Sequence, residues 1–172
     1  MTEDQVFILA GPVHAGKTSF LLRFLQGARD DGLPVNGILS LASFQGSNRK
    51  GYDAFDLSTR DSYPLLRTDP DPDWLRVGPF GMIPEGLQRA EAAITDTGRS
   101  NLTVIDEMGH LELAGRGFWP GFQVVMKRRQ PALVVVRLEL VSRFQKAIHA
   151  RTRIFRFYAD GLAEDMRSRL FS

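Results

Sequence analysis

GPVHAGKTS, residues 11–19, is a glycine-bearing turn that ends in Lys17 and Thr18. The residues before it, QVFILA, form a short apolar run that predicts a buried strand over 5–10. Beyond it, apolar residues recur at helical spacing and predict a helix from Lys17 to about Asp31. The turn therefore lies between a strand and a helix, which is the context that a phosphate-binding loop requires.

A loop of this kind suits a phosphate chain because its backbone amides converge on one point beside a helix N-terminus. Glycine at positions 11 and 16 allows backbone angles and a close approach that a side chain would block. We expect Lys17 to reach the β- and γ-phosphates and the Thr18 hydroxyl to bind Mg²⁺. His14 is interpreted as an exposed loop residue rather than a base. The predicted nucleotide-binding residues are Gly11, Pro12, Val13, His14, Ala15, Gly16, Lys17, Thr18 and Ser19.

A second candidate feature is the run LTVIDE, residues 102–107, which predicts a buried parallel strand ending in two carboxylates. Mg²⁺ prefers oxygen ligands, and phosphate loops are usually accompanied by a carboxylate at the end of a nearby strand. Asp106 is expected to hold the metal, directly or through water. Glu107 is expected to face the γ-phosphate and to orient or deprotonate an attacking water. The alternative is that Asp106 caps a turn and Glu107 is surface charge.

The rest of the chain alternates between predicted strands and helices, which indicates an α/β fold with a mainly parallel sheet and one added β-hairpin. No repeat or linker divides it, so residues 1–172 are expected to form a single domain. We predict strands over 35–43, 52–59, 62–67, 131–138 and 153–159, and helices over 84–98, 117–128, 140–150 and 160–171. The hairpin is expected to have a polar tip over 44–51, and residues 68–84 are expected to form an irregular surface connection.

The composition excludes several classes of function. The chain has no cysteine, which rules out disulfides and thiol chemistry. The first apolar run is short and no stretch approaches the roughly 18 apolar residues of a membrane span, so a cytoplasmic protein is expected. Residues 127–172 carry 11 basic and 4 acidic side chains, but no nucleic-acid-binding motif accompanies them. We therefore expect no membrane partner and consider a nucleic-acid partner unlikely.

Several stretches together resemble one family. GPVHAGKTSFLLRFL, RKGYDAFDL, LRVGPFGM and VIDEMGHLEL match, in order and spacing, the THEP1-type nucleoside-triphosphatases, called cancer-related NTPases in animals. The resemblance covers most of residues 5–158. It implies a three-layer, RecA-like P-loop NTPase fold and slow Mg²⁺-dependent hydrolysis of ATP, GTP and other nucleoside triphosphates. It also assigns catalysis to Lys17, Asp106 and Glu107, and the metal to Thr18 and Asp106.

The chain departs from the family's pattern at three places. NGILSLASFQGSN, residues 36–48, lacks the acidic and basic residues usual there, His110 replaces a usual lysine, and ALVVVRLEL replaces a small polar turn. Base recognition and a charge-neutralising arginine therefore do not carry over. The candidate cations for that last role are Arg49, Lys50, Arg116 and Arg137. We interpret Glu112 as a structural carboxylate that holds its loop and His110 as an exposed loop residue.

Two alternatives to hydrolysis remain. Small nucleotide kinases share this fold and length, although the arginines of RIFRFYA alternate like a strand rather than a lid. A nucleotide-dependent switch that assists a partner protein is the other alternative, with TDPDPDW and the basic C-terminal third as partner surfaces.

Overall fold

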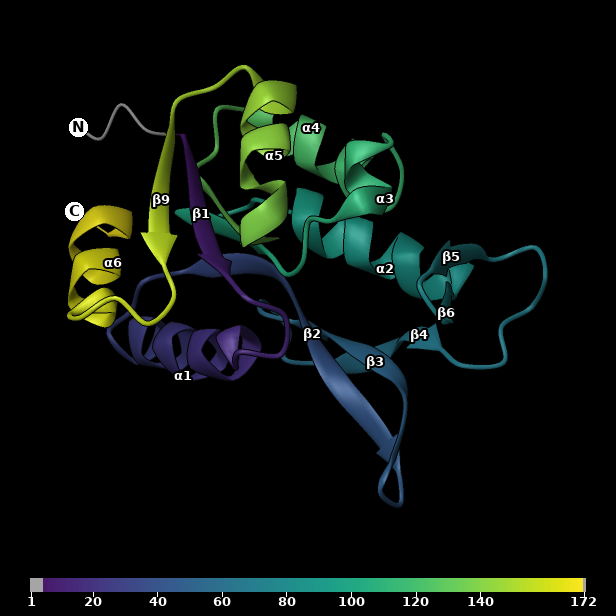
Figure 1. The fold of residues 1–172 in the computed structure, drawn as a ribbon. Helices are drawn as coiled ribbons and strands as arrows, with labels where there is room; N and C mark the ends of the chain where they lie inside the picture. Colours follow the sequence, from purple (N-terminus) through teal and green to yellow (C-terminus); the bar gives the residue numbers. More distant parts are fainter. Residues whose placement is uncertain (1–4, 172) are drawn as a thin grey trace.

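Five parallel strands form the centre of the sheet in this computed structural model, which describes residues 5–171. Their spatial order is β2–β7–β8–β1–β9, so β8 separates β1 from β7. β9 lies on the other side of β1 (Figure 1). The bounds are Val6–Gly11 (β1), Val35–Gln45 (β2), Leu102–Ile105 (β7), Ala132–Arg137 (β8) and Thr152–Arg156 (β9). All residues of β1 are buried, as expected for a central strand covered on both faces.

Helices cover both faces of this sheet and form the outer layers (Figure 1). One layer holds α1 and α6, whose apolar side chains pack with Phe7 and Leu9 of β1; the other packs on Val6 and Ile8. The helices are α1 (Lys17–Asp30), α2 (Pro84–Thr95), α3 (His110–Leu113), α4 (Trp119–Lys127), α5 (Val141–Ile148) and α6 (Leu162–Leu170). The three-layer α/β prediction is confirmed. Within the described chain, no helix has the length and apolar character needed to cross a membrane.

An antiparallel extension continues the sheet beyond β2. It contains four strands, in the order β3–β4–β6–β5. Their bounds are Asn48–Asp56 (β3), Ser62–Arg67 (β4), Leu75–Val77 (β5) and Phe80–Met82 (β6). β3 and β4 correspond to the strands predicted over 52–59 and 62–67, whereas β5 and β6 were not predicted. The prediction of an irregular connection over 68–84 is therefore wrong for its second half. The apolar residues on both sides of the Gly78–Pro79 turn pair with each other, and the neighbouring prolines and aspartates masked this signal.

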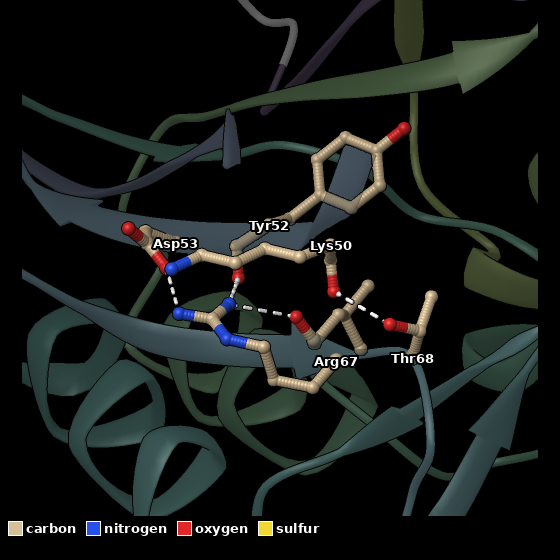
Figure 2. Close-up of polar contacts among 6 residues, drawn as sticks. Lys50, Tyr52, Asp53, Arg67 and Thr68 are labelled. Carbon is tan, nitrogen blue, oxygen red and sulfur yellow. Dashed lines mark hydrogen bonds and ion pairs between the residues drawn. The ribbon is translucent and has the colours of Figure 1, made fainter. Parts of the chain in front are cut away.

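The hairpin formed by β2 and β3 is longer than predicted and projects from the body of the protein (Figure 1). Pairing continues to Gln45 and Asn48, so only residues 46–47 form the turn. The predicted tip over 44–51 is polar and largely exposed, but most of it belongs to the two strands. At its base, the Arg67 guanidinium donates to the Asp53 carboxylate at 2.6 Å and to the Tyr52 carbonyl oxygen at 3.1 Å (Figure 2). These bonds tie β4 to β3 and brace the hairpin where it leaves the sheet.

Other boundaries differ by a few residues. The predicted helix over 84–98 ends at Thr95, and the short helix α3 and a 3₁₀ turn, Leu138–Leu140, were not predicted. The strand predicted over 153–159 ends at Arg156. Phe157 still donates its N–H to the Ala10 carbonyl oxygen at 2.8 Å, but Tyr158 then adopts a left-handed backbone, with φ of 72°, which ends the pairing.

Candidate functional site

The phosphate loop occupies residues 12–16, between the carboxyl end of β1 and the first residue of α1. The backbone is left-handed at His14 and at Gly16, where φ is 94°. A Cβ atom at Gly11 would lie 2.8 Å from Cβ of Phe157, so only glycine fits there. Among residues 5–171, no side chain caps the N-terminus of α1. Its first backbone amides therefore stay available to an anion in the loop.

Lys17 is the first residue of α1 and only 7% of it is exposed. Its Nζ donates to the Gly11 carbonyl oxygen at 3.1 Å and to that of Pro12. Burial lowers the pKa of Lys17, and the nearby carboxylates of Glu107 and Asp106 oppose that shift. The amine thus folds back over the loop that would hold a phosphate, with carbonyl oxygens as its acceptors.

Asp106 follows directly after β7 and is 3% exposed. Its Oδ2 accepts from the Thr18 hydroxyl at 2.7 Å and from the Ser40 amide at 3.2 Å, while its carbonyl oxygen accepts from the Ser40 hydroxyl at 2.6 Å. Burial raises the pKa of Asp106 to about 6, and the hydrogen bonds from Thr18 and Ser40 oppose the shift. The two predicted metal ligands, from α1 and the end of β7, therefore lie in direct contact.

The chemistry of this pair fits a divalent metal. A hydroxyl and a carboxylate are hard oxygen ligands of the type that Mg²⁺ prefers. Over residues 5–171, no group of three or more Cys, His, Asp or Glu side chains could hold a metal by itself. A Mg²⁺ ion at Thr18 and Asp106 would accordingly take its other ligands from water and phosphate, which is the usual way that proteins bind this ion.

The buried charge of Asp106 leads to a prediction about stability: Asp106→Asn should raise the unfolding temperature of the metal-free protein near pH 7.5. The folded-state pKa of about 6 exceeds the ordinary 3.8, so the ionised carboxylate opposes folding. This cost is fully present above the folded-state pKa and is lost as the pH falls toward the ordinary value. A shift of about two pKa units corresponds to roughly 3 kcal/mol at most, and asparagine keeps an oxygen acceptor.

Thermal unfolding in EDTA, near pH 7.5 and near pH 4.5, measures this effect as the difference between the two proteins. The variant's advantage should shrink at the lower pH. A variant that is less stable than the wild type at both values would contradict the assignment of a buried, ionised carboxylate.

Glu107 lies next to Asp106 at the rim of the site, with its side chain 35% exposed. Its Oε1 accepts from Nε of Arg137 at 2.8 Å. Arg137 is the last residue of β8, and its Cα pairs in register with Gly11, the last residue of β1 before the phosphate loop. Because β8 lies between β1 and β7, the sheet brings this arginine between the loop and the acidic pair.

Glu112 holds the loop after β7, as the sequence predicted. It is buried, and its carboxylate accepts from the backbone amides of Gly109 at 2.8 Å and Phe118 at 3.2 Å. Burial raises the pKa of Glu112, and these two hydrogen bonds oppose the shift. The carboxylate therefore ties the residue before α3 to the residue before α4.

The other candidates lie outside this group of contacts. His14 and His110 are exposed, as predicted, and Arg116 is exposed after α3. Arg49 stacks on the rings of Phe44 and Tyr52 near the hairpin turn, and the Lys50 carbonyl oxygen accepts from Thr68 (Figure 2). Of the four cations considered from the sequence, Arg137 is the one bonded to a predicted site residue.

Two neighbours of the site were missed by sequence reasoning. Ser40 holds Asp106 from β2, and its signal was a serine directly after the buried first half of that strand, which runs parallel to β7. Tyr158 donates its hydroxyl to the Ala15 carbonyl oxygen at 3.1 Å, inside the phosphate loop. No local signal identifies Tyr158, because its position depends on β9 pairing with β1.

This chain resembles known proteins in sequence. The sequence profile of the family described as NTPase matches residues 6–170. The nucleoside-triphosphatase THEP1 of Methanopyrus kandleri is 29% identical over 130 residues, which cover 75% of this chain and 71% of that protein. The cancer-related nucleoside-triphosphatase homolog of Mus musculus is 27% identical, covering 74% of this chain and 71% of that protein.

Solved structures show the same fold. The solution structure of a human cancer-related nucleoside triphosphatase superimposes with a TM-score of 0.71 at 22% identity, covering 96% of this chain and 94% of that one. The crystal structure of THEP1 from Aquifex aeolicus gives 0.65 at 18% identity, covering 97% and 99%. Because the family profile spans nearly the whole chain, this protein belongs to the NTPase family, as a THEP1-type nucleoside-triphosphatase enzyme.

Proposed function

We propose that this enzyme hydrolyses ATP, GTP and other nucleoside triphosphates to the diphosphate and phosphate, slowly, with Mg²⁺ and with little preference for the base. The observation that carries the proposal is the hydrogen-bonded pair Thr18–Asp106 beside the phosphate loop, with Glu107 following directly. Lys17 adds a buried cation at the same place. One anionic, metal-bound phosphate chain would satisfy all of these groups.

In the proposed reaction, Lys17 transfers its hydrogen bonds from the carbonyl oxygens of Gly11 and Pro12 to phosphate oxygens. Mg²⁺ held by Thr18 and Asp106 would supply positive charge to the phosphates. Glu107 orients a water molecule and accepts its proton. The water oxygen bonds to the γ-phosphorus as the bond to the bridging oxygen breaks, and the nucleoside diphosphate leaves with that oxygen.

Arg137 is the candidate for the positive charge that stabilises this transition state. A fully engaged arginine is worth roughly 10³–10⁵ in rate. Here Nε of Arg137 donates to Glu107, the proposed general base, at 2.8 Å. This bond orients Glu107 and holds the guanidinium away from full contact with the phosphate. This competition supports the proposal of slow turnover by the isolated protein.

The alternatives predict different behaviour. A kinase would need an arginine-rich lid, but Thr152–Arg156 is strand β9, which pairs with β1. Its arginines therefore belong to the sheet and not to a lid. A switch would bind nucleotide tightly and release phosphate only with a protein partner.

We place the enzyme in the cytoplasm, with nucleoside triphosphates as its small-molecule partners and no role for nucleic acid.

Phosphate release from ATP, GTP, CTP and UTP, measured with Mg²⁺ and again with EDTA, tests the proposal directly. Slow release from all four that EDTA abolishes is the expected result. Tight binding without release would instead favour a missing acceptor or partner. Release from one triphosphate alone would contradict the proposed lack of base preference.

Asp106→Asn should raise the Mg²⁺ concentration that gives half-maximal activity, because the metal loses a charged ligand. A Mg²⁺ titration of phosphate release measures the change, with the exposed Asp61→Asn as a control that removes the same charge elsewhere. Superimposable titrations of Asp106→Asn and wild type would remove Asp106 from the metal site.

A further inference from the structure

Tyr158 is the most exposed of the large apolar side chains in the described chain, at 71%. It follows β9, and its hydroxyl donates to the Ala15 carbonyl oxygen at 3.1 Å. A single exposed aromatic ring needs no explanation by itself, so what matters is where this ring lies. This ring is exposed at the edge of the phosphate loop and is bonded to the loop itself.

The ring is also held in place from behind. Phe157 and Tyr158 pack with ring centroids 4.6 Å apart, and Phe157 contacts Phe20 of α1 edge-on at 5.8 Å. The ring of Tyr158 is therefore fixed by packing on one side and by the bond to Ala15 at its tip. A ligand that stacked on it would pay little conformational entropy to order it.

The sheet order determines which part of a nucleotide could reach this ring. The Thr18–Asp106 pair would hold the metal, and with it the β- and γ-phosphates, on the side of the loop that faces β7. The α-phosphate and nucleoside extend away from the γ-phosphate along the chain. β9 lies on the opposite side of β1 from β8 and β7, and Tyr158 follows its end.

We propose that Tyr158 is the platform on which the nucleobase of the substrate stacks, an inference that rests on the proposed function of the phosphate loop. Every base has a π-face, so stacking accepts purines and pyrimidines alike, whereas hydrogen bonds to base edges would distinguish them. Stacking on Tyr158 explains how the enzyme accepts different nucleobases although its sequence carries no motif that recognises base edges. Stacking strengthens with ring area, so purines bind somewhat more tightly than pyrimidines.

The test compares ligands with and without a base. Dissociation constants are measured by calorimetry with Mg²⁺ for the β,γ-imido analogues of ATP, GTP, CTP and UTP, and for inorganic tripolyphosphate. Tyr158→Ala should weaken binding of the nucleotide analogues by roughly 5- to 150-fold, most for purines, and leave tripolyphosphate unchanged. Tyr158→Phe, which keeps the ring and loses only the hydroxyl, should retain the preference for nucleotides over tripolyphosphate.

Two further variants sharpen the comparison. Tyr158→Leu keeps apolar bulk without an aromatic face and should resemble Tyr158→Ala. Ile154→Ala removes an exposed apolar side chain from the middle of β9, the strand that precedes Tyr158, and should bind like the wild type. Unfolding temperatures confirm that each variant is folded.

Other outcomes would overturn the inference. An equal loss for tripolyphosphate and nucleotides would mean that Tyr158 supports the loop through Ala15 instead of contacting the base. No loss for either ligand would place the base elsewhere. A wild type that bound neither would reject the phosphate site itself, whereas tight base-dependent binding without hydrolysis would reject the proposed reaction and leave the platform standing.

Discussion

Glu107→Gln is expected to lower phosphate release by about 10²-fold or more while the affinity for nucleoside triphosphate stays close to that of the wild type. Glutamine has the shape of glutamate, and its side-chain oxygen still accepts from Nε of Arg137, which lies 2.8 Å from Oε1 of Glu107. It does not accept a proton from water. The loss should therefore fall on the turnover number and not on binding, and steady-state phosphate release with a separate titration of an imido analogue measures both.

Glu139→Gln is the matched control for this experiment. Glu139 is an exposed carboxylate whose charge also acts on the pKa of Lys17, so it shares the electrostatic neighbourhood of Glu107. If only the local negative charge mattered, both variants would slow to a similar degree. We expect Glu139→Gln to retain most of the wild-type rate. A near-wild-type rate for Glu107→Gln would move the base to another residue.

The parts of the site that were predictable from the sequence are those where local pattern and chemistry coincide. The strand, loop and helix around Lys17 follow from a change of periodicity at a glycine-bearing turn, and these elements end within one residue of the prediction. Asp106 and Glu107 follow from a short apolar run that ends in carboxylates. The assignment of Thr18 and Asp106 to one metal predicted that these residues lie close together, and Asp106 accepts a hydrogen bond from Thr18.

The parts that were missed depend on strand order, which no local pattern encodes. Arg137 was one candidate among four until β8 was placed between β1 and β7, beside Glu107. Ser40 and Tyr158 reach the site because β2 pairs with β7 and β9 pairs with β1. The strands β5 and β6 were not predicted for a different reason. Each has only three residues and is surrounded by prolines and aspartates, so it offers too few alternating positions for a strand pattern to be recognised.

Lys17→Ala is expected to abolish tight binding of nucleoside triphosphate, with a loss on the order of 10²-fold or more in affinity. Hydrogen bonds to charged partners contribute about 1.5–3 kcal/mol each, and the amine would bond to both the β- and γ-phosphates. In the free protein the amine is bonded to the carbonyl oxygens of Gly11 and Pro12, so these bonds offset part of the gain on binding. Titration with an imido analogue in Mg²⁺ measures the loss.

Truncating a lysine that is only 7% exposed could also disturb the loop, so Lys17→Met is needed beside Lys17→Ala. Methionine keeps a long apolar side chain that can fill the space of the lysine stem, but it lacks the charge. Lys127→Ala at the exposed end of α4 provides the control for a lost surface lysine. If both Lys17 variants fold and lose affinity together, the charge is what binds the phosphates. If Lys17→Met binds like the wild type, the amine does not contact the ligand, and the residues after β1 are a glycine turn without the proposed phosphate site.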